Sequence, residues 1–309
     1  MKSILFSLCF FPLIGFANGI DSLQTDADVY RFLVKLDSRN KPDSVNAYNS
    51  MYAEAYERKV ADSLHVKLWQ KTDFNNDGQT DLLVCAFNGS SSRLLAVVSN
   101  NGKYKIVNLT DGLGGLYGYP AIFFPVIKKD KKNTTIFVYF KSGRRNTVNE
   151  QFPVNGAFEL NCIKLVYKFN SFTELNSNPT MHTIQNLTFS GGGGLMGGDV
   201  KLSVDSKREV VYAYSGISGN PGGTYSGTID TATYNELVSI LNYINFPEMP
   251  DRFYKNVIDA VAYYLSITYD NGKIKKIQDY PAGESNYGLN LLYNELSKLE
   301  DTRQLKKVN

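Results

Sequence analysis

Short apolar runs separated by turn-forming clusters limit the fold of this chain more than any other feature. Between residues 64 and 169 there are seven such runs, rich in β-branched and aromatic residues, including DLLVCAF, RLLAVVS and TTIFVYF. Runs of this length, bounded by Gly, Asn, Asp and Ser, are typical of strands. NNG at 100–102 favours a tight hairpin because Asn and Gly tolerate positive φ. The region is therefore predicted to form an antiparallel meander.

Apolar residues at helical spacing precede these predicted strands. In TDADVYRFLVKLD, Thr25 is placed as an N-cap with Asp28 three residues later, and apolar residues follow at helical intervals. Residues 45–61 favour a second helix. NSNPT at 176–180 has the composition of a linker.

After this linker the pattern changes to strands followed by helices. Three strand-like runs precede a helical pattern over residues 231–246, and two more strands flank DNG at 270–272 before a last helix. The sequence therefore predicts an α+β fold in two domains. Residues 18–178 are predicted to form a mostly antiparallel β domain that begins with one or two helices. Residues 179–309 form an antiparallel sheet with two covering helices.

Residues 1–17 have the pattern of a secretory signal peptide. Lys2 precedes an apolar run from Ile4 to Ile14, and the small residues Gly15 and Ala17 suit a cleavage site after Ala17. The apolar run is shorter than the roughly 20 residues that span a bilayer. We expect an exported protein without a transmembrane segment, located in the periplasm, at the cell surface or outside the cell.

The charge balance argues against nucleic acid as a partner. The chain has 33 basic and 30 acidic residues, and its net charge is only +3. The densest basic stretch, KKDKK at 128–132, lies between two apolar runs and is predicted to be a hairpin loop.

Two cysteines, Cys85 and Cys162, remain after the predicted cleavage. Export to an oxidising compartment permits a disulfide between them, and two buried thiols fit their apolar surroundings equally well. Both alternatives stay open at this point. The spacing of Cys and His does not suggest a zinc site.

The stretch DFNNDGQTD at 73–81 places oxygen-bearing side chains at every second position. Calcium takes six to eight oxygen ligands, and three carboxylates this close repel one another unless a cation lies between them. The predicted ligands are the side chains of Asp73, Asn75, Asp77 and Asp81 and the backbone carbonyl of Gln79. Gly78 permits the sharp turn. We expect a structural calcium ion, with an Asp-rich hairpin turn as the alternative.

This loop is not an EF-hand, because Val84 occupies the position of the bidentate Glu and strands flank the loop. DFNNDGQTDLLV resembles the calcium-binding hairpin of FG-GAP and related integrin-type repeats. The resemblance covers residues 64–88 in a single copy, so it implies the hairpin and not the propeller that several repeats build.

The glycine tract FSGGGGLMGGD at 189–199 lacks the Lys-Ser/Thr pair of a phosphate-binding loop, and we expect a flexible surface loop. From residue 183 to 300, the order of DVKLSVD, EVVYAYS, GTYSGTID, NELVSILNYINF and NGKIKKIQDY resembles an exported bacterial domain family of uncharacterised function. The cysteines that many members carry in the Gly-rich turn are missing here. The resemblance implies no activity.

Catalytic signals are sparse. His65 and His182 are the only histidines, GISGN at 216–220 misses the nucleophile-elbow pattern by one residue, and Asp251 and Asp259 are the candidate carboxylate pair. The sequence favours a calcium-stabilised module that binds or scaffolds a protein or glycan ligand. The alternative is a carboxylate-dependent hydrolase that acts on exported polymers.

Overall fold

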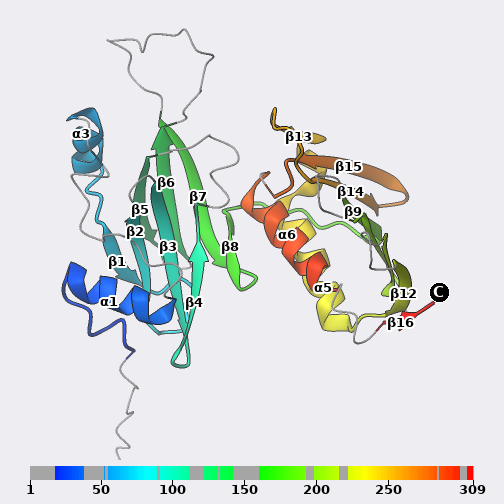
Figure 1. The fold of residues 1–309 in the computed structure, drawn as a ribbon, viewed down its shortest axis with the longest axis horizontal. Helices are drawn as coiled ribbons and strands as arrows, with labels where there is room; N and C mark the ends of the chain where they lie inside the picture. Colours follow the sequence, from blue (N-terminus) through cyan, green and yellow to red (C-terminus); the bar gives the residue numbers. More distant parts are fainter. Residues whose placement is uncertain are drawn as a thin grey trace, which may run out of the picture.

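The computed structural model describes residues 18–37, 52, 55–88, 91–110, 122–130, 133–141, 160–192, 198–215, 222–283, 285–299 and 305–308. The predicted signal peptide and the GISGN segment lie outside these residues. Three sheets and their covering helices make up the fold (Figure 1), which confirms the predicted α+β class.

The N-terminal half contains two four-stranded antiparallel sheets (Figure 1). The first has the order β1 (Trp69–Thr72), β2 (Asp81–Asn88), β3 (Ser91–Asn100) and β4 (Lys103–Asn108). The second has the order β5 (Phe123–Lys129), β6 (Thr134–Lys141), β7 (Leu160–Lys168) and β8 (Ser171–Glu174). The predicted single meander is therefore divided in two. The described part of KKDKK, residues 128–130, covers the end of β5 and the start of the predicted hairpin turn, where the Asn133 amide donates to Asp130 Oδ1.

The run DLLVCAF is apolar at successive positions because β2 belongs to a middle layer. Leu83 and Cys85 pack against the second sheet in one core cluster. Leu82 and Val84 face the opposite way and pack against helix α1 (Asp26–Leu36) in another cluster. A strand buried on both faces loses the usual alternation of polar and apolar residues.

Two described helices precede the sheets. α1 has the predicted capping box, in which Thr25 and Asp28 exchange hydrogen bonds. The second helix, α3, is described over Ala55–Ser63 and continues two residues past the predicted 45–61, of which residues 45–51, 53 and 54 lie outside the described part of the chain. His65 has φ +53° in the turn after α3, so the strand predicted from residue 64 begins only at Trp69.

The C-terminal half is built on one eight-stranded sheet with the order β13-β15-β14-β9-β10-β11-β12-β16. Its strands are β9 (Ile184–Gly192), β10 (Val200–Asp205), β11 (Glu209–Tyr214), β12 (Gly223–Thr228), β13 (Arg252–Tyr254), β14 (Ala262–Tyr269), β15 (Lys273–Tyr280) and β16 (Lys306–Lys307). The predicted DNG hairpin joins β14 to β15. Neighbouring strands are antiparallel except β13 and β15, which pair in parallel.

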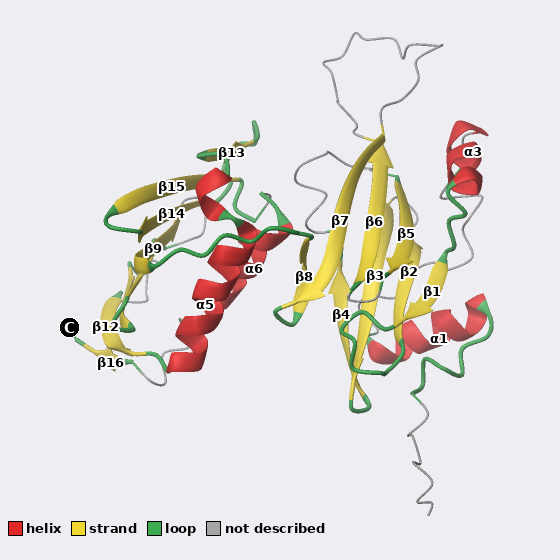
Figure 2. Cartoon of the chain, turned by 180° about the vertical axis from the view of Figure 1, so that it is seen from behind, coloured by secondary structure: helices red, strands yellow, loops and turns green. Residues whose placement is uncertain are grey.

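Two helices cover one face of this sheet, as predicted (Figure 2). They are α5 (Thr231–Ile244), followed by the short 3-10 helix η2 (Phe246–Glu248), and α6 (Tyr287–Lys298). The helical spacing predicts one apolar face of α5 made of Leu237, Ile240, Leu241 and Ile244. The first three are buried against the sheet, and Ile244 is half-buried.

The described ends of the glycine tract are packed against neighbouring residues, which corrects the prediction of a surface loop for those residues. Gly191 belongs to β9, and a Cβ there would lie 2.8 Å from Cδ1 of Tyr263. A Cβ on Gly198 would lie 2.2 Å from the carbonyl oxygen of Ser215. Glycine is required at both positions because any side chain would collide. Residues 193–197 lie outside the described part of the chain.

Helix α6 contacts the N-terminal half through its first turn. The Glu174 carboxylate on β8 accepts hydrogen bonds from the amides of Tyr287, at 2.8 Å, and Gly288, at 3.0 Å. The Tyr287 ring is buried in the core between the two N-terminal sheets, and its hydroxyl donates to the carbonyl of Leu109. Burial raises the pKa of Glu174, although the helix amides favour its charged form.

Cys85 and Cys162 are both free, so the disulfide alternative was wrong. Cys85 is buried in the core, and burial raises the pKa of its thiol to about 12. Cys162 is exposed on β7. The alternative of two buried thiols is therefore correct only for Cys85.

We expect the mature chain to show one accessible thiol when folded and two when unfolded. A bulky maleimide should label Cys162 in native buffer, and it should reach Cys85 only in denaturant, because a buried thiol of high pKa is inert. Mass spectrometry of the labelled protein measures both. Cys162→Ser is the control and should abolish native labelling. Two labels in native buffer would contradict the burial of Cys85.

Candidate functional site

The Asp-rich stretch connects β1 and β2, which pair antiparallel from Trp69 opposite Val84 to Thr72 opposite Asp81. The predicted strand-loop-strand arrangement is therefore present. Phe74, the second residue of the stretch, is buried and packs edge-on against Phe172 at a ring distance of 5.2 Å. This aromatic anchor fixes the loop to the core, and the polar periodicity of the sequence did not reveal it.

Asp73, Asn75 and Asp77 are brought together at the tip of the loop. The Asp73 carboxylate accepts hydrogen bonds from the amides of Asp77, at 3.3 Å, and Gly78, at 2.9 Å. Asn75 Oδ1 accepts from the Asp77 amide at 3.2 Å, and Asn75 Nδ2 donates to Asp77 Oδ2 at 2.9 Å. Gly78 has φ +82°, which favours glycine at the turn.

Asp81 has a different environment, because its side chain is completely buried at the start of β2. Its two carboxylate oxygens accept hydrogen bonds of 2.7 Å from the amides of Phe74 and Ser99. Burial raises the pKa of Asp81 to about 6, and the charges of Asp77 and Asp73 act in the same direction. Asp81 therefore joins the loop to β3 and adds negative charge close to the loop carboxylates.

Gln79 and Thr134 link the loop to its surroundings. Gln79 Oε1 accepts from the Asn101 amide at 3.0 Å, in the β3–β4 turn, and its Nε2 donates to Asp77 at 3.2 Å. Thr134 Oγ1, on β6, donates to the Asp73 carbonyl at 2.7 Å. The role of Thr134 was missed from the sequence, since it depends on the packing of two sheets.

The oxygen donors of this loop fit a hard cation. Asp73 and Asp77 supply exposed carboxylates, Asn75 supplies an amide oxygen, and the buried charge of Asp81 lacks solvent screening. The described residues contain no group of three or more His, Cys, Asp or Glu side chains that could hold a metal ion. The loop offers amide and carbonyl oxygens beside its carboxylates, and calcium takes ligands of both kinds.

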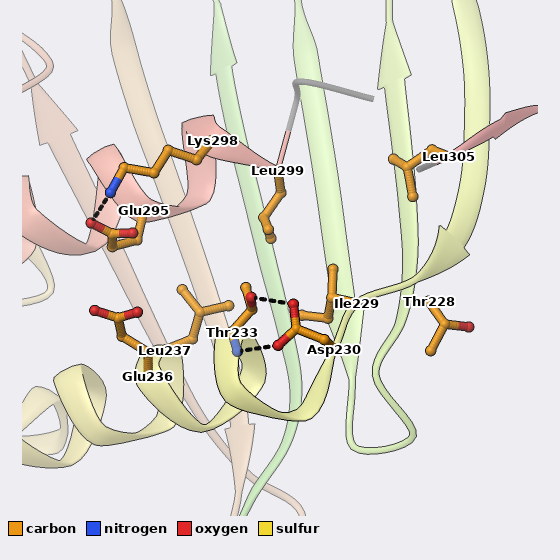
Figure 3. A pocket seen from close by; sticks show the side chains of 10 residues that line it. All are labelled: Thr228, Ile229, Asp230, Thr233, Glu236, Leu237, Glu295, Lys298, Leu299 and Leu305. Atoms are coloured by element: carbon orange, nitrogen blue, oxygen red, sulfur yellow. Dashed lines mark hydrogen bonds and ion pairs between the residues drawn. The ribbon is translucent and has the colours of Figure 1, made fainter. Parts of the chain in front are cut away.

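A pocket of about 360 Å³ lies between α5, α6 and the end of β12 (Figure 3). It combines the apolar side chains of Ile229, Leu237, Leu299 and Leu305 with the polar side chains of Thr228, Asp230, Thr233, Glu236, Glu295 and Lys298. Two of its three carboxylates, those of Glu295 and Asp230, already have structural partners. Glu295 is ion-paired with Lys298, and Asp230 caps α5 by accepting the Thr233 amide at 2.8 Å.

This pocket does not favour acid catalysis by Asp230. The hydrogen bonds from the Thr233 amide and hydroxyl lower the pKa of Asp230. A general acid requires the opposite shift, so that the carboxyl keeps its proton near neutral pH.

The remaining catalytic candidates have structural roles. Asp251 is ion-paired with Lys275 Nζ at 2.6 Å, and Asp259 has φ +58° in a turn. His182 Nδ1 lies 2.5 Å from Asp270 Oδ2, and Asp270 Oδ1 also accepts the Thr183 amide at 2.9 Å. The His182–Asp270 pair thus attaches the segment before β9 to the β14–β15 hairpin.

Comparison with known proteins gives one family match. A family model for a domain of unknown function, DUF6438, matches residues 199–300, which run from the start of β10 to the end of α6. The match does not reach residues 64–88, where the resemblance to the FG-GAP hairpin stays a prediction. A search of curated proteins finds no match to the chain. From residue 199 to 300, the chain is therefore similar to a domain family whose function is unknown.

Proposed function

We propose that this chain is an exported binding or scaffolding protein whose N-terminal sheets are stabilised by calcium in the loop 73–81. The observation that carries the proposal is the gathering of Asp73, Asn75 and Asp77 above the buried carboxylate of Asp81. The ion would be held by these side chains and by the backbone carbonyl of Gln79, and its charge would offset the three carboxylates.

A structural role follows from what the loop contacts. Through Thr134 it is joined to the second sheet, and through Ser99 and Asn101 to β3 and the β3–β4 turn. Ordering the loop therefore stabilises both sheets. An extracellular calcium concentration would fill even a weak site, with a dissociation constant of about 10⁻⁴–10⁻³ M.

The proposed export rests on the signal sequence. Asn18, the residue that follows the predicted cleavage site, donates to the Thr80 carbonyl and accepts from the Tyr104 hydroxyl at 3.0 Å. Among the described residues, the helices are too short or too polar to cross a membrane.

Calcium should raise the thermal stability of the mature protein, and chelation should lower it. An ion that binds the folded state alone adds RT ln(1 + [Ca]/Kd), about 2.7 kcal/mol at a hundredfold excess over Kd. Asp77→Ala should abolish the response because it removes a charged ligand. Gln79→Ala is the control and should keep most of the response, since its backbone carbonyl remains; loss of its side-chain bonds to Asn101 and Asp77 should lower the melting temperature in both buffers. Magnesium should substitute poorly because it requires a tighter octahedral site.

Differential scanning fluorimetry in calcium and in chelator measures this response, and elemental analysis reports bound metal. Identical melting curves in both buffers, together with metal-free protein, would show that the loop is only an Asp-rich turn.

A further inference from the structure

The start of helix α6 contains buried side-chain oxygens that are not hydrogen-bonded to the described part of the chain. Ser285 Oγ, Asn290 Oδ1 and Tyr293 Oη are closed to solvent, and among the described residues none of these atoms has a partner. Ser285 is completely buried, and Tyr293 is 3% exposed. Nearly all buried polar groups in folded proteins are hydrogen-bonded, because an unpaired one is costly. Their occurrence in one short segment therefore points to a bound group that satisfies them.

Ser285 and Asn290 lie beside each other because of the way the helix begins. Asn286 is the N-cap of α6, and its side chain accepts a hydrogen bond from the Leu289 amide at 2.8 Å. Ser285 therefore precedes the cap, and Asn290 is the fourth helical residue. Side chains at these two positions often pack against each other, usually as an apolar pair. Here both side chains are polar, and no direct hydrogen bond joins their two oxygens.

Tyr293 and Asp279 lie close to this pair. Tyr293 is three residues after Asn290, so both side chains are on one face of α6. Asp279, at the end of β15, is 1% exposed, and its Oδ2 accepts from the Gly283 amide at 3.2 Å. A Cβ on Gly283 would lie 3.8 Å from Asn290 Oδ1. Burial raises the pKa of Tyr293, and the nearby charge of Asp279 acts in the same direction. These side chains therefore converge between β15 and α6.

The hydrogen-bonding capacities of these groups match a water molecule. The hydroxyls of Ser285 and Tyr293 can donate, whereas Asn290 Oδ1 and the Asp279 carboxylate accept. A water both accepts and donates, and buried waters typically make about three hydrogen bonds to polar groups that are otherwise unsatisfied. A metal ion would use only the lone pairs of these oxygens and would leave the protons of both hydroxyls without acceptors in the cluster. The donor set therefore favours water.

We propose that one buried water molecule bridges the hydroxyls of Ser285 and Tyr293 and the amide oxygen of Asn290. It fixes the start of α6 to the segment that follows β15. The same turn of α6 carries the amides of Tyr287 and Gly288, which donate to the Glu174 carboxylate on β8. The water thus positions the turn through which α6 contacts the N-terminal half. This site is separate from the calcium loop and does not depend on it.

The sign of one stability change tests the proposal. With the water in place, Tyr293→Phe removes one of its partners, and the unfolding equilibrium should shift about fivefold toward the unfolded state. Without the water, the same substitution removes an unsatisfied buried hydroxyl, and the protein should become more stable. Urea unfolding of the mature protein in chelator compares the variant with the parent. A higher midpoint for Tyr293→Phe would overturn the proposal.

A double-mutant cycle tests whether the partners share one water. The loss in Tyr293→Phe/Asn290→Ala should be smaller than the sum of the single losses, because both oxygens bond the same molecule. Tyr234→Phe is the matched control. Its hydroxyl, on α5, donates directly to the Ile184 carbonyl at 3.1 Å, so its loss should add to that of Asn290→Ala. Additive losses in the Tyr293 cycle would contradict a shared water.

A crystal structure of the mature protein identifies the bound group directly. We expect a water oxygen within about 2.5–3.2 Å of Ser285 Oγ, Asn290 Oδ1 and Tyr293 Oη. A side chain in that place would overturn the proposal. Urea unfolding with sodium replaced by choline at equal ionic strength separates water from a cation. The midpoint should stay unchanged, and a lower midpoint in choline would assign the site to an ion and refute the water.

Discussion

Asp81→Ala should destabilise the protein with or without calcium, because it leaves the buried amides of Phe74 and Ser99 without their acceptors. Each unsatisfied amide costs about 1–3 kcal/mol, and removal of a buried charge offsets part of this, so we expect a net loss of about 2–4 kcal/mol. Urea unfolding in chelator measures the change. Asp77→Ala is the control, since Asp77 bonds only exposed loop groups, and it should lose much less.

Asp81 also predicts how stability depends on pH. Its pKa is about 6 in the folded protein, above the ordinary value of 3.8. The folded state therefore keeps a proton that the unfolded chain has released, and the contribution of Asp81 to stability decreases as the pH rises from about 4 to about 6. Asp81→Asn should flatten this part of the profile in chelator. An unchanged slope, or equal stability of Asp81→Ala and Asp77→Ala, would contradict the assigned role.

Tyr287→Ala should uncouple the two halves of the chain. The ring belongs to the core between the N-terminal sheets although it lies on α6. Removal of a large buried aromatic side chain costs about 3–5 kcal/mol. We expect the N-terminal sheets of the variant to unfold at a lower temperature than the C-terminal sheet. Calorimetry should then resolve two unfolding transitions, which overlap more in the parent protein.

Tyr264→Ala is the control for this experiment, because the Tyr264 side chain is half exposed on the far face of the C-terminal sheet. It should leave the melting profile nearly unchanged. A single transition of unaltered midpoint in Tyr287→Ala would show that α6 does not couple the halves. The same experiment tests the predicted boundary at residue 178, because separate domains should then unfold separately.

Local patterns predicted most elements, and long-range pairing explains most of what they missed. DNG and NNG specified their hairpins because positive φ is a local requirement, met here by Asn271 and Asn101. The division into two facing sheets depends on a shared core that includes Leu83 of β2 and Ile136 of β6, and sequence periodicity does not encode which strands share a core. The parallel pairing of β13 with β15 was missed for the same reason.

The candidate site shows the same limit. Alternation in DFNNDGQTD predicted that Asp73, Asn75 and Asp77 would gather, and hydrogen bonds join them. It also treated Asp81 as an equivalent ligand, whereas burial gives that residue two amide partners and a raised pKa. Burial depends on the sheet that covers a position, so spacing alone could not separate this carboxylate from the other two.

The two edges of the C-terminal sheet end in very short strands, β13 with three residues and β16 with two. β16 consists of Lys306 and Lys307, both exposed, and the Val308 amide donates to the Thr224 carbonyl at 2.8 Å. A short, lysine-bearing strand offers little backbone for another copy to pair with. Residues 306–308 thus limit intermolecular extension of the sheet. A chain shortened before Lys306 would expose the backbone of β12 and become prone to edge-to-edge aggregation.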